Sequence, residues 1–373
     1  MKKEYNLKVN PFRSTPAIEE GEIIWAGFKE LKNKIEGRLK RSLKIPNSSI
    51  VLNWGEYGSG KTHAARYFSK QKVLSDISKE IGSSVPFSLV FSLPKGKEPV
   101  KDIFISVIDN LDLDNLRTLF DGVDFKIDTV IENSTKNILY KSVLSAIFDS
   151  TTDKHLLKKY LYGESTKTEI STLNETLDNK ILRPLNKDND YILLLASLFT
   201  CMTYKKKVYS SVVIWLDEFE DIQVLNSTNI DKTNNFLREL LDYTPNNLLV
   251  FINLTQTSLF GVSDLSEYIY DSVKSRIRER INFEIPNESA LRNYLTEILA
   301  IYRHDEEKGN AYHPFEVDLV ENVIKDMSNS SLRAFNEALS LLIELADMDN
   351  IIPSISDDFY QSVKPEIIGW KDE

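Results

Sequence analysis

The sequence is poor in the residues that build disulfide frameworks, zinc sites and membrane spans. It has one cysteine, Cys201, among 373 residues, which excludes an internal disulfide. No window approaches the roughly 18 uncharged apolar residues that a membrane helix needs, and no apolar segment follows Met1. These absences predict a cytoplasmic protein without a membrane partner. The four histidines are scattered and show no zinc-ligand spacing: His63, His155, His304 and His313.

Positive charge is also scarce. The chain has 46 Lys and Arg against 56 Asp and Glu, a net charge of −10, which argues against a surface that binds polyanions as a whole. Any contact with nucleic acid must therefore be local. Residues 205–207, three lysines beside Tyr204, form one basic stretch, which we interpret as a solvated face. A second basic cluster comprises Lys274, Arg276, Arg278 and Arg280.

The most informative stretch covers residues 49–65, SIVLNWGEYGSGKTHAA. Gly55, Gly60, Lys61 and Thr62 have the spacing of a phosphate-binding P-loop, with an apolar strand before it and good helix formers after it. Glycines let successive N–H groups point inward, and the following helix adds the positive end of its dipole. Lys61 is expected to reach the β- and γ-phosphates, and the Thr62 hydroxyl to ligate Mg²⁺. The expected nucleotide contacts are Gly55, Tyr57, Gly58, Ser59, Gly60, Lys61, Thr62 and His63.

A second stretch that contains candidate catalytic and metal-binding residues is 208–221, VYSSVVIWLDEFED. Its apolar run places Asp217 and Glu218 at the carboxyl end of a buried strand, where open α/β sheets bind ligands. Asp217 can support a Mg²⁺ shell, and Glu218 can polarise an attacking water. Glu220 and Asp221 are interpreted as solvated residues or as caps of the next helix.

Another buried strand, residues 248–252, ends in polar groups that could orient water: Asn253, Thr255 and Gln256. Alternation puts the first two on one face and Gln256 on the other, which leaves the choice open. Residues 266–280 read as helical and precede a last strand at 281–285. An arginine of the basic cluster could reach the nucleotide of a neighbouring subunit. The alternative is surface charge on an amphipathic helix.

The remaining segments complete an α/β organisation. An extended segment around Asn10, Pro11, Thr15 and Pro16 precedes a helix at 23–43, which lies over the nucleotide base or packs on the core. A buried strand at 85–93 and a helix at 100–111 continue a β-α-β-α alternation, which predicts a parallel sheet between helices. Residues 112–207 read as a helical insertion with a mobile centre at 151–188. Residues 287–373 read as helical, with Arg333 in a first turn where the dipole disfavours a cation.

The order of these parts resembles the AAA+ ATPases, in the branch with origin-recognition, transposition-regulator and ExeA-type ATPases. NPFRSTPA is similar to the N-terminal arm of that branch, and GEYGSGKT and WLDEFE resemble its Walker A and Walker B motifs. LLVFINLTQTSLF is similar to the sensor 1 strand, which favours Gln256, and SRIRERINFEIP resembles the segment with the trans-acting arginine finger, which favours Arg276. SSLRAFNEAL resembles sensor 2 and points to Arg333. FSLPKGKEPVKDIF has a looser similarity to ATPases of phage-exclusion systems.

This resemblance implies an AAA+ ATPase with ATP and Mg²⁺ as cofactors, active as a homo-oligomer. The expected domains are an N-terminal arm (1–48), a P-loop core (49–285) with the insertion (112–207), and a C-terminal helical lid (286–373). Its role is expected to be a switch that acts on double-stranded DNA or a DNA-bound partner, in anti-phage defence or mobile-element biology. The alternative is a signalling or scaffold ATPase that recruits a protein effector encoded nearby.

Overall fold

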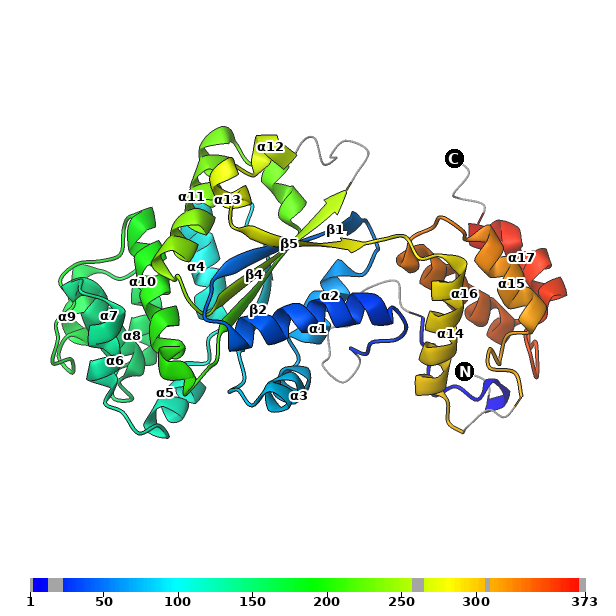
Figure 1. Cartoon of the computed structure of the whole chain (residues 1–373), viewed down its shortest axis with the longest axis horizontal. Coiled ribbons are helices and arrows are strands. Elements are labelled where there is room, and N and C mark those ends of the chain that lie inside the picture. Colours follow the sequence, from blue (N-terminus) through cyan, green and yellow to red (C-terminus); the bar gives the residue numbers. More distant parts are fainter. Residues whose placement is uncertain (1–2, 13–22, 257–264, 306–308, 369–373) are drawn as a thin grey trace. The chain divides into compact units, whose positions relative to one another are not determined.

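The computed structural model describes residues 3–12, 23–256, 265–305 and 309–368. The chain divides into two compact units, both built from segments that are separate in the sequence (Figure 1). The first unit contains residues 1–35, 54–67 and 282–373, and the second contains residues 36–53 and 68–281. Thr15 and Pro16, part of the predicted extended arm, lie outside the described residues.

The fold is built around a five-stranded sheet with the order β2-β3-β4-β1-β5. Its strands are β1 (Ser49–Glu56), β2 (Phe87–Ser92), β3 (Val212–Asp217), β4 (Leu248–Gln256) and β5 (Ile277–Phe283). Strand β3 pairs in parallel with β2 on one side and with β4 on the other. The predicted α/β fold with a parallel P-loop sheet is therefore confirmed.

The centre of the sheet is apolar on both faces, as expected for strands covered by helices. Every residue of β3 is buried, and Trp215 stacks on Phe251 of β4 with ring centroids 3.8 Å apart. Phe68 stacks on the same tryptophan at 6.4 Å. The strand predicted at 85–93 is present as β2, but the prediction that it is buried was wrong. Strand β2 lies at the edge of the sheet, and most of its residues are half-exposed.

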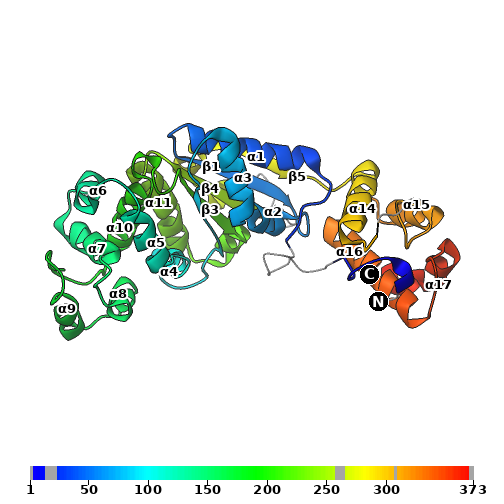
Figure 2. The same cartoon turned by 90° about the horizontal axis from the view of Figure 1, so that it is seen from below.

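Helices of the second unit cover the sheet and form the insertion. Helix α10 packs against α4, α6, α7 and α11, and Figures 1 and 2 both show α6 to α9 gathered on the side of α10 away from the sheet. The helices from α3 to α7 are α3 (Gln71–Ile81), α4 (Pro99–Asp109), α5 (Leu113–Asp121), α6 (Ile127–Ser134) and α7 (Ile138–Phe148). They are followed by α8 (Lys154–Leu161), α9 (Lys167–Leu173), α10 (Asp188–Met202) and α11 (Ser227–Tyr243).

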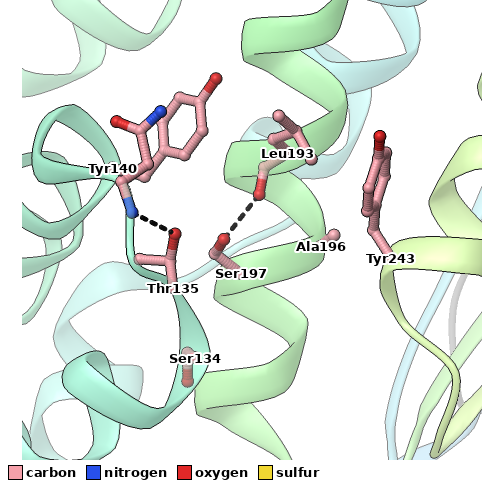
Figure 3. Close-up of a pocket in the computed structure, with 8 residues that line it drawn as sticks. Ser134, Thr135, Tyr140, Leu193, Ala196, Ser197 and Tyr243 are labelled. Atoms are coloured by element: carbon pink, nitrogen blue, oxygen red, sulfur yellow. Dashed lines mark hydrogen bonds between the residues drawn. The ribbon is translucent and has the colours of Figure 1, made fainter.

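A cavity of about 210 Å³ lies between the end of α6, α7, α10 and the end of α11 (Figure 3). Its lining consists of Ser134, Thr135, Asn137, Tyr140, Leu193, Ala196, Ser197 and Tyr243. Ser197 donates to the carbonyl of Leu193 at 2.7 Å, and Thr135 accepts from the backbone N–H of Asn137 at 3.2 Å. These polar groups serve the local helix geometry, and no lining residue carries a charge.

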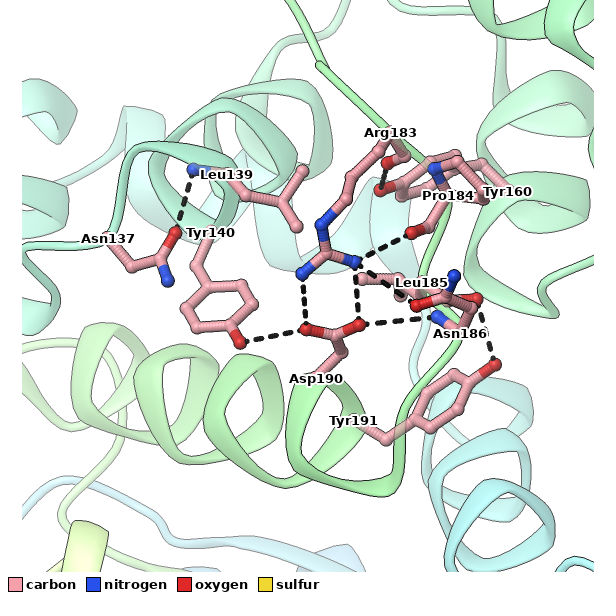
Figure 4. A network of polar contacts seen from close by, with 10 residues as sticks. All are labelled: Asn137, Leu139, Tyr140, Tyr160, Arg183, Pro184, Leu185, Asn186, Asp190 and Tyr191. Atoms are coloured by element: carbon pink, nitrogen blue, oxygen red, sulfur yellow. Dashed lines mark hydrogen bonds and ion pairs between the residues drawn. The ribbon is translucent and has the colours of Figure 1, made fainter.

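A polar network around Asp190 attaches the centre of the insertion to α10 (Figure 4). Arg183 donates to both carboxylate oxygens of Asp190 at 2.7 Å, and Tyr140 donates to the same carboxylate at 3.1 Å. Tyr160 of α8 donates to the carbonyl of Arg183 at 2.8 Å. Burial raises the pKa of Asp190, but the hydrogen bonds from Arg183, the Asn186 backbone and Tyr140 outweigh burial and hold it below its ordinary value.

The first unit contains the predicted C-terminal helical region. Its helices are α14 (Glu288–Tyr302), α15 (Val317–Asp326), α16 (Leu332–Met348) and α17 (Asp357–Ile368). Their apolar core also buries Tyr5, Leu7 and Phe12 from the beginning of the chain. Leu7 forms an antiparallel bridge with Arg303, and the Tyr5 hydroxyl donates to the carbonyl of Ile351 at 2.7 Å. The N-terminal residues thus complete the C-terminal helical core.

Two predicted helices differ from the structure. The helix predicted at 23–43 is α1 (Lys29–Lys44), because Gly27 and Phe28 have positive φ angles that interrupt a helix. The helix predicted at 266–280 is replaced by the short α12 (Leu265–Tyr268) and α13 (Asp271–Lys274), after which β5 begins at Ile277. In the described residues, no helix combines the length and apolarity that crossing a bilayer requires.

Candidate functional site

The P-loop connects β1 to α2 (Lys61–Phe68), and close packing in the first unit requires its glycines. A Cβ on Gly55 would lie 2.4 Å from the carbonyl oxygen of Phe283. Gly58 has φ +76°, which L side chains rarely adopt. Glycines at these positions give the turn before α2 the close backbone approach that a phosphate chain needs.

Lys61 lies within this turn and is only 6% exposed. Its ammonium donates to the carbonyls of Gly55 at 2.9 Å and Glu56 at 2.8 Å, and to the Ser59 hydroxyl at 3.2 Å. Thr62 follows as the second residue of α2. The residues predicted to contact a nucleotide therefore form one continuous turn, and its donors fit a phosphate group with Mg²⁺.

His63 joins this turn to the N-terminal arm. Its Nε2 lies 2.6 Å from the carbonyl oxygen of Ile24, and Trp25 packs against the rings of His63 and Tyr67 on α2. Gly27 packs against Tyr294 of α14. The residues just before α1 therefore pack on α2 and α14, and a position of the arm over a nucleotide base stays a prediction.

The lid helix α16 begins at the P-loop. Ser331 caps it by accepting from the N–H of Ala334 at 3.3 Å. The backbone N–H of Arg333 donates to the carbonyl of Gly58 at 3.2 Å, and its guanidinium lies 4.4 Å from the centroid of the Tyr57 ring. The structure thus brings the predicted lid arginine to the predicted nucleotide-binding turn, within one unit.

In the second unit, Asp217 is the last residue of β3 and is 6% exposed. It accepts a hydrogen bond from the side-chain amide of Asn253 at 2.9 Å. Asn253 in turn accepts from the amide of Asn53 on β1 at 2.7 Å, and both asparagines are fully buried. Sequence reasoning missed Asn53, although a polar residue inside the buried run IVLNW was a signal for it.

The acidic residues after Asp217 have different surroundings. Glu218 is exposed and has φ +51°, a left-handed conformation that is uncommon for residues with a side chain and is often found at functional sites. Glu220 accepts from the backbone N–H of Thr255 at 3.0 Å, and Asp221 pairs with Lys95 at 2.9 Å. The interpretation of Glu220 and Asp221 as solvated residues or caps was wrong, because both hold this turn in place.

Among the three polar residues of β4, Asn253 makes the contact with Asp217. Thr255 is buried and Gln256 is exposed at the end of the strand. A role for Gln256 as sensor 1 stays a prediction. The contact of Asn253 makes it a further candidate for the same role.

Arg276 lies just before β5, and its carbonyl accepts from the N–H of Ile50 at 3.0 Å. Its guanidinium pairs with Asp242 of α11 at 2.5 Å. Ile50 lies at the beginning of β1. A role for Arg276 at another subunit's nucleotide stays a prediction.

The basic stretch at 205–207 has a structural role. Lys206 donates to the carbonyl of Leu43 at 2.6 Å, near the end of α1, and burial lowers its pKa.

Within the part of the chain that the structure describes, no group of three or more His, Cys, Asp or Glu residues could hold a metal.

Sequence comparison finds no protein-family model and no curated protein that matches this chain. Among solved structures, the ORC2 protein of Aeropyrum pernix in its ADPNP–ADP complexes has a TM-score of 0.54 at 14% identity, over 91% of this chain and 67% of that chain. The A. pernix ORC1 protein in complex with DNA has a TM-score of 0.49 at 13% identity, over 93% and 67%. PCH-2 from C. elegans has a TM-score of 0.45 at 14% identity, over 96% and 73%.

The ORC2 protein is the one of these three with a TM-score above 0.5, and at 14% identity it shows a shared fold alone. Together with the strand order and the helical C-terminal region, this match defines the class. The chain has an α/β fold with a parallel P-loop sheet, a helical insertion and a C-terminal helical region, and it shares this fold with the ORC2 protein.

Proposed function

We propose that this protein is an AAA+ switch that binds and hydrolyses ATP with Mg²⁺. The observation that carries the proposal is the contact of Arg333 with the P-loop, 3.2 Å from its N–H to the carbonyl of Gly58. The guanidinium of Arg333 and the ammonium of the buried Lys61 both lie beside this turn. Together they supply two cations for the charge of a triphosphate. The fold of ORC2, whose structure contains ADPNP and ADP, supports the choice of nucleotide.

Each predicted site residue has a role in this proposal. Lys61 and the P-loop N–H groups bind the phosphates, while Thr62 and Asp217 hold Mg²⁺, which supplies charge neutralisation when bound. Asn253 holds the Asp217 carboxylate in one orientation. Glu218, exposed after β3, accepts a proton from the attacking water, and Gln256 or Asn253 orients that water. Thr62 and Asp217 are assigned to one ion because P-loop ATPases hold Mg²⁺ with the P-loop Ser or Thr and a Walker B Asp.

We propose that ATP bridges two subunits of a homo-oligomer. Support comes from Arg276, which lies beside the beginning of β1, away from the end of β1 that leads into the P-loop. An arginine in that position stabilises transition-state charge only when it is supplied to a neighbouring site. For this activity, residues 49–285 form the ATPase core and 286–373 the lid.

The proposed biological role is action on double-stranded DNA or a DNA-bound partner, in anti-phage defence or mobile-element biology. Its support is the resemblance of the motif order to the branch of AAA+ ATPases that includes the origin-recognition ATPases. A protein effector is the second candidate, and a specific observation favours it. The insertion exposes two large apolar side chains, Ile138 at 67% and Leu182 at 71%, on a chain whose net charge is −10. Such residues suit a protein partner better than a phosphate backbone.

Calorimetry with the Lys61→Ala variant tests the nucleotide site. We expect ATP binding to be lost, whereas Lys72→Ala, an exposed lysine of α3, serves as the matched control. Unchanged ATP affinity in Lys61→Ala would remove the P-loop assignment. ATPase measurements with duplex DNA at 50 and 200 mM salt then separate the two roles, since stimulation by DNA contact must fall steeply with salt. No response to DNA favours the protein effector.

A further inference from the structure

Tyr57 is an exposed aromatic residue in the P-loop. Its side chain is 67% exposed, yet the guanidinium of Arg333 lies 4.4 Å from the centroid of its ring. The presence of a tyrosine at this position is therefore not explained by packing in an apolar core. The electron-rich face of an aromatic ring attracts a cation, most favourably a planar guanidinium. The contact joins the nucleotide-binding turn to the first turn of the lid helix.

The backbone fixes the two partners close together. Besides the hydrogen bond from the N–H of Arg333 to Gly58, a Cβ on Gly58 would lie 2.8 Å from the Cβ of Arg333 and from the Ser331 hydroxyl. The first turn of α16 therefore sits directly on the backbone of Gly58. A cation is disfavoured in the first turn of a helix, and the Tyr57 ring offsets this disadvantage for the guanidinium.

We propose that Tyr57 is a positioning residue for Arg333. Its ring holds the guanidinium beside the P-loop and thereby couples the binding of the terminal phosphate of a nucleoside triphosphate to the docking of α16. The inference rests on the proposed function, because it assumes that this P-loop binds ATP. It adds that the preference of the site for a triphosphate over a diphosphate depends on two residues, Tyr57 of the P-loop and Arg333 of α16.

A double-mutant cycle on the full chain tests the pair. Dissociation constants for ATP and ADP are measured by calorimetry for Tyr57→Leu, Arg333→Ala and the double variant. We expect Tyr57→Leu to reduce the preference for ATP over ADP about two- to fivefold. The same substitution in the Arg333→Ala background is expected to have no further effect. Tyr57→Phe, which keeps the ring face, is expected to restore the preference, and Tyr243→Leu is the control at an exposed tyrosine outside the P-loop.

Additive effects of Tyr57→Leu and Arg333→Ala would overturn the pairing. An equal loss of ATP and ADP affinity in Tyr57→Leu would also overturn it, because that result describes a simple nucleotide contact. Gly58→Ala provides a second variant, expected to abolish the preference for ATP by displacing α16. If Lys61→Ala also binds ATP normally, the proposed function itself fails. If Lys61→Ala loses ATP while Tyr57→Leu retains the preference, only the Tyr57 inference fails.

Discussion

Asn253 donates to Asp217 through its side-chain amide at 2.9 Å, and this bond fixes the direction of a buried carboxylate. The amide of Asn53 donates to the oxygen of Asn253 at 2.7 Å, so the nitrogen of Asn253 must face Asp217. The three residues come from β1, β4 and β3, neighbours in the sheet. Strands of one sheet therefore set the orientation of this carboxylate.

Replacing Asn253 tests this arrangement. Asn253→Ala leaves two buried polar groups without this partner, and we expect a loss of about 1–3 kcal/mol in the free energy of unfolding together with slower turnover. Gln256→Ala is the matched comparison, because Gln256 is exposed on the same strand and its loss should not destabilise the fold. Urea denaturation and phosphate release are measured for both. Normal turnover in Asn253→Ala would show that this amide has no part in catalysis.

Glu218→Gln should separate nucleotide binding from hydrolysis. The amide keeps the size of the side chain but cannot accept the proton of the attacking water, so ATP stays bound while turnover falls by about two to four orders of magnitude. Calorimetry and phosphate release measure the two properties. Glu220→Gln is a demanding control, since Glu220 instead holds the backbone of Thr255. Undiminished phosphate release by Glu218→Gln would place the base elsewhere.

Arg276→Ala should remove turnover without weakening ATP binding, because we propose that Arg276 acts on the nucleotide of another subunit. The expected loss is about 10³- to 10⁵-fold, as for other arginine fingers. Mixing with Glu218→Gln subunits should restore activity in part, since an interface in which the Arg276→Ala subunit supplies Glu218 and the Glu218→Gln subunit supplies Arg276 has both residues intact. Arg280→Ala, on the neighbouring strand β5, provides the comparison. Failure of the mixture to recover activity would argue against action between subunits.

The lowered pKa of Asp190 predicts that the stability of the folded protein depends on pH. Its pKa in the folded protein is lowered from 3.8, so its stabilising contribution is complete above that value and is lost as the pH falls through the lower folded pKa. Asp190→Asn should therefore flatten the decline in stability below about pH 4 and cost about 2 kcal/mol at pH 7. Arg183, 44% exposed, limits the cost to less than that of a fully buried pair.

Urea denaturation followed by circular dichroism at pH 7, 5, 4 and 3 measures this dependence. Asp271→Asn is the control, because the Asp271 side chain is fully exposed. The same slope below pH 4 in Asp190→Asn and the unmodified protein would contradict the assignment of this dependence to Asp190.

Local patterns were enough to predict the P-loop turn and the strand that ends at Asp217. In both cases the signal lies within a few neighbouring residues: glycine spacing or an unbroken apolar run. The same is true of the parallel sheet, which follows from the alternation of strands and helices. These features depend on interactions between residues that are close together in the sequence.

Contacts between distant residues decided the rest. Residues 266–280 have a helical pattern, but pairing of the Arg276 carbonyl with Ile50 starts a strand. The N-terminal Tyr5 completes the C-terminal helical core, and Asn53 meets Asn253 across 200 residues. The sequence by itself determined which residues could bind phosphate and metal. Only the tertiary structure decided which side chains hold them in place, because burial and hydrogen bonding depend on neighbours that the chain order does not specify.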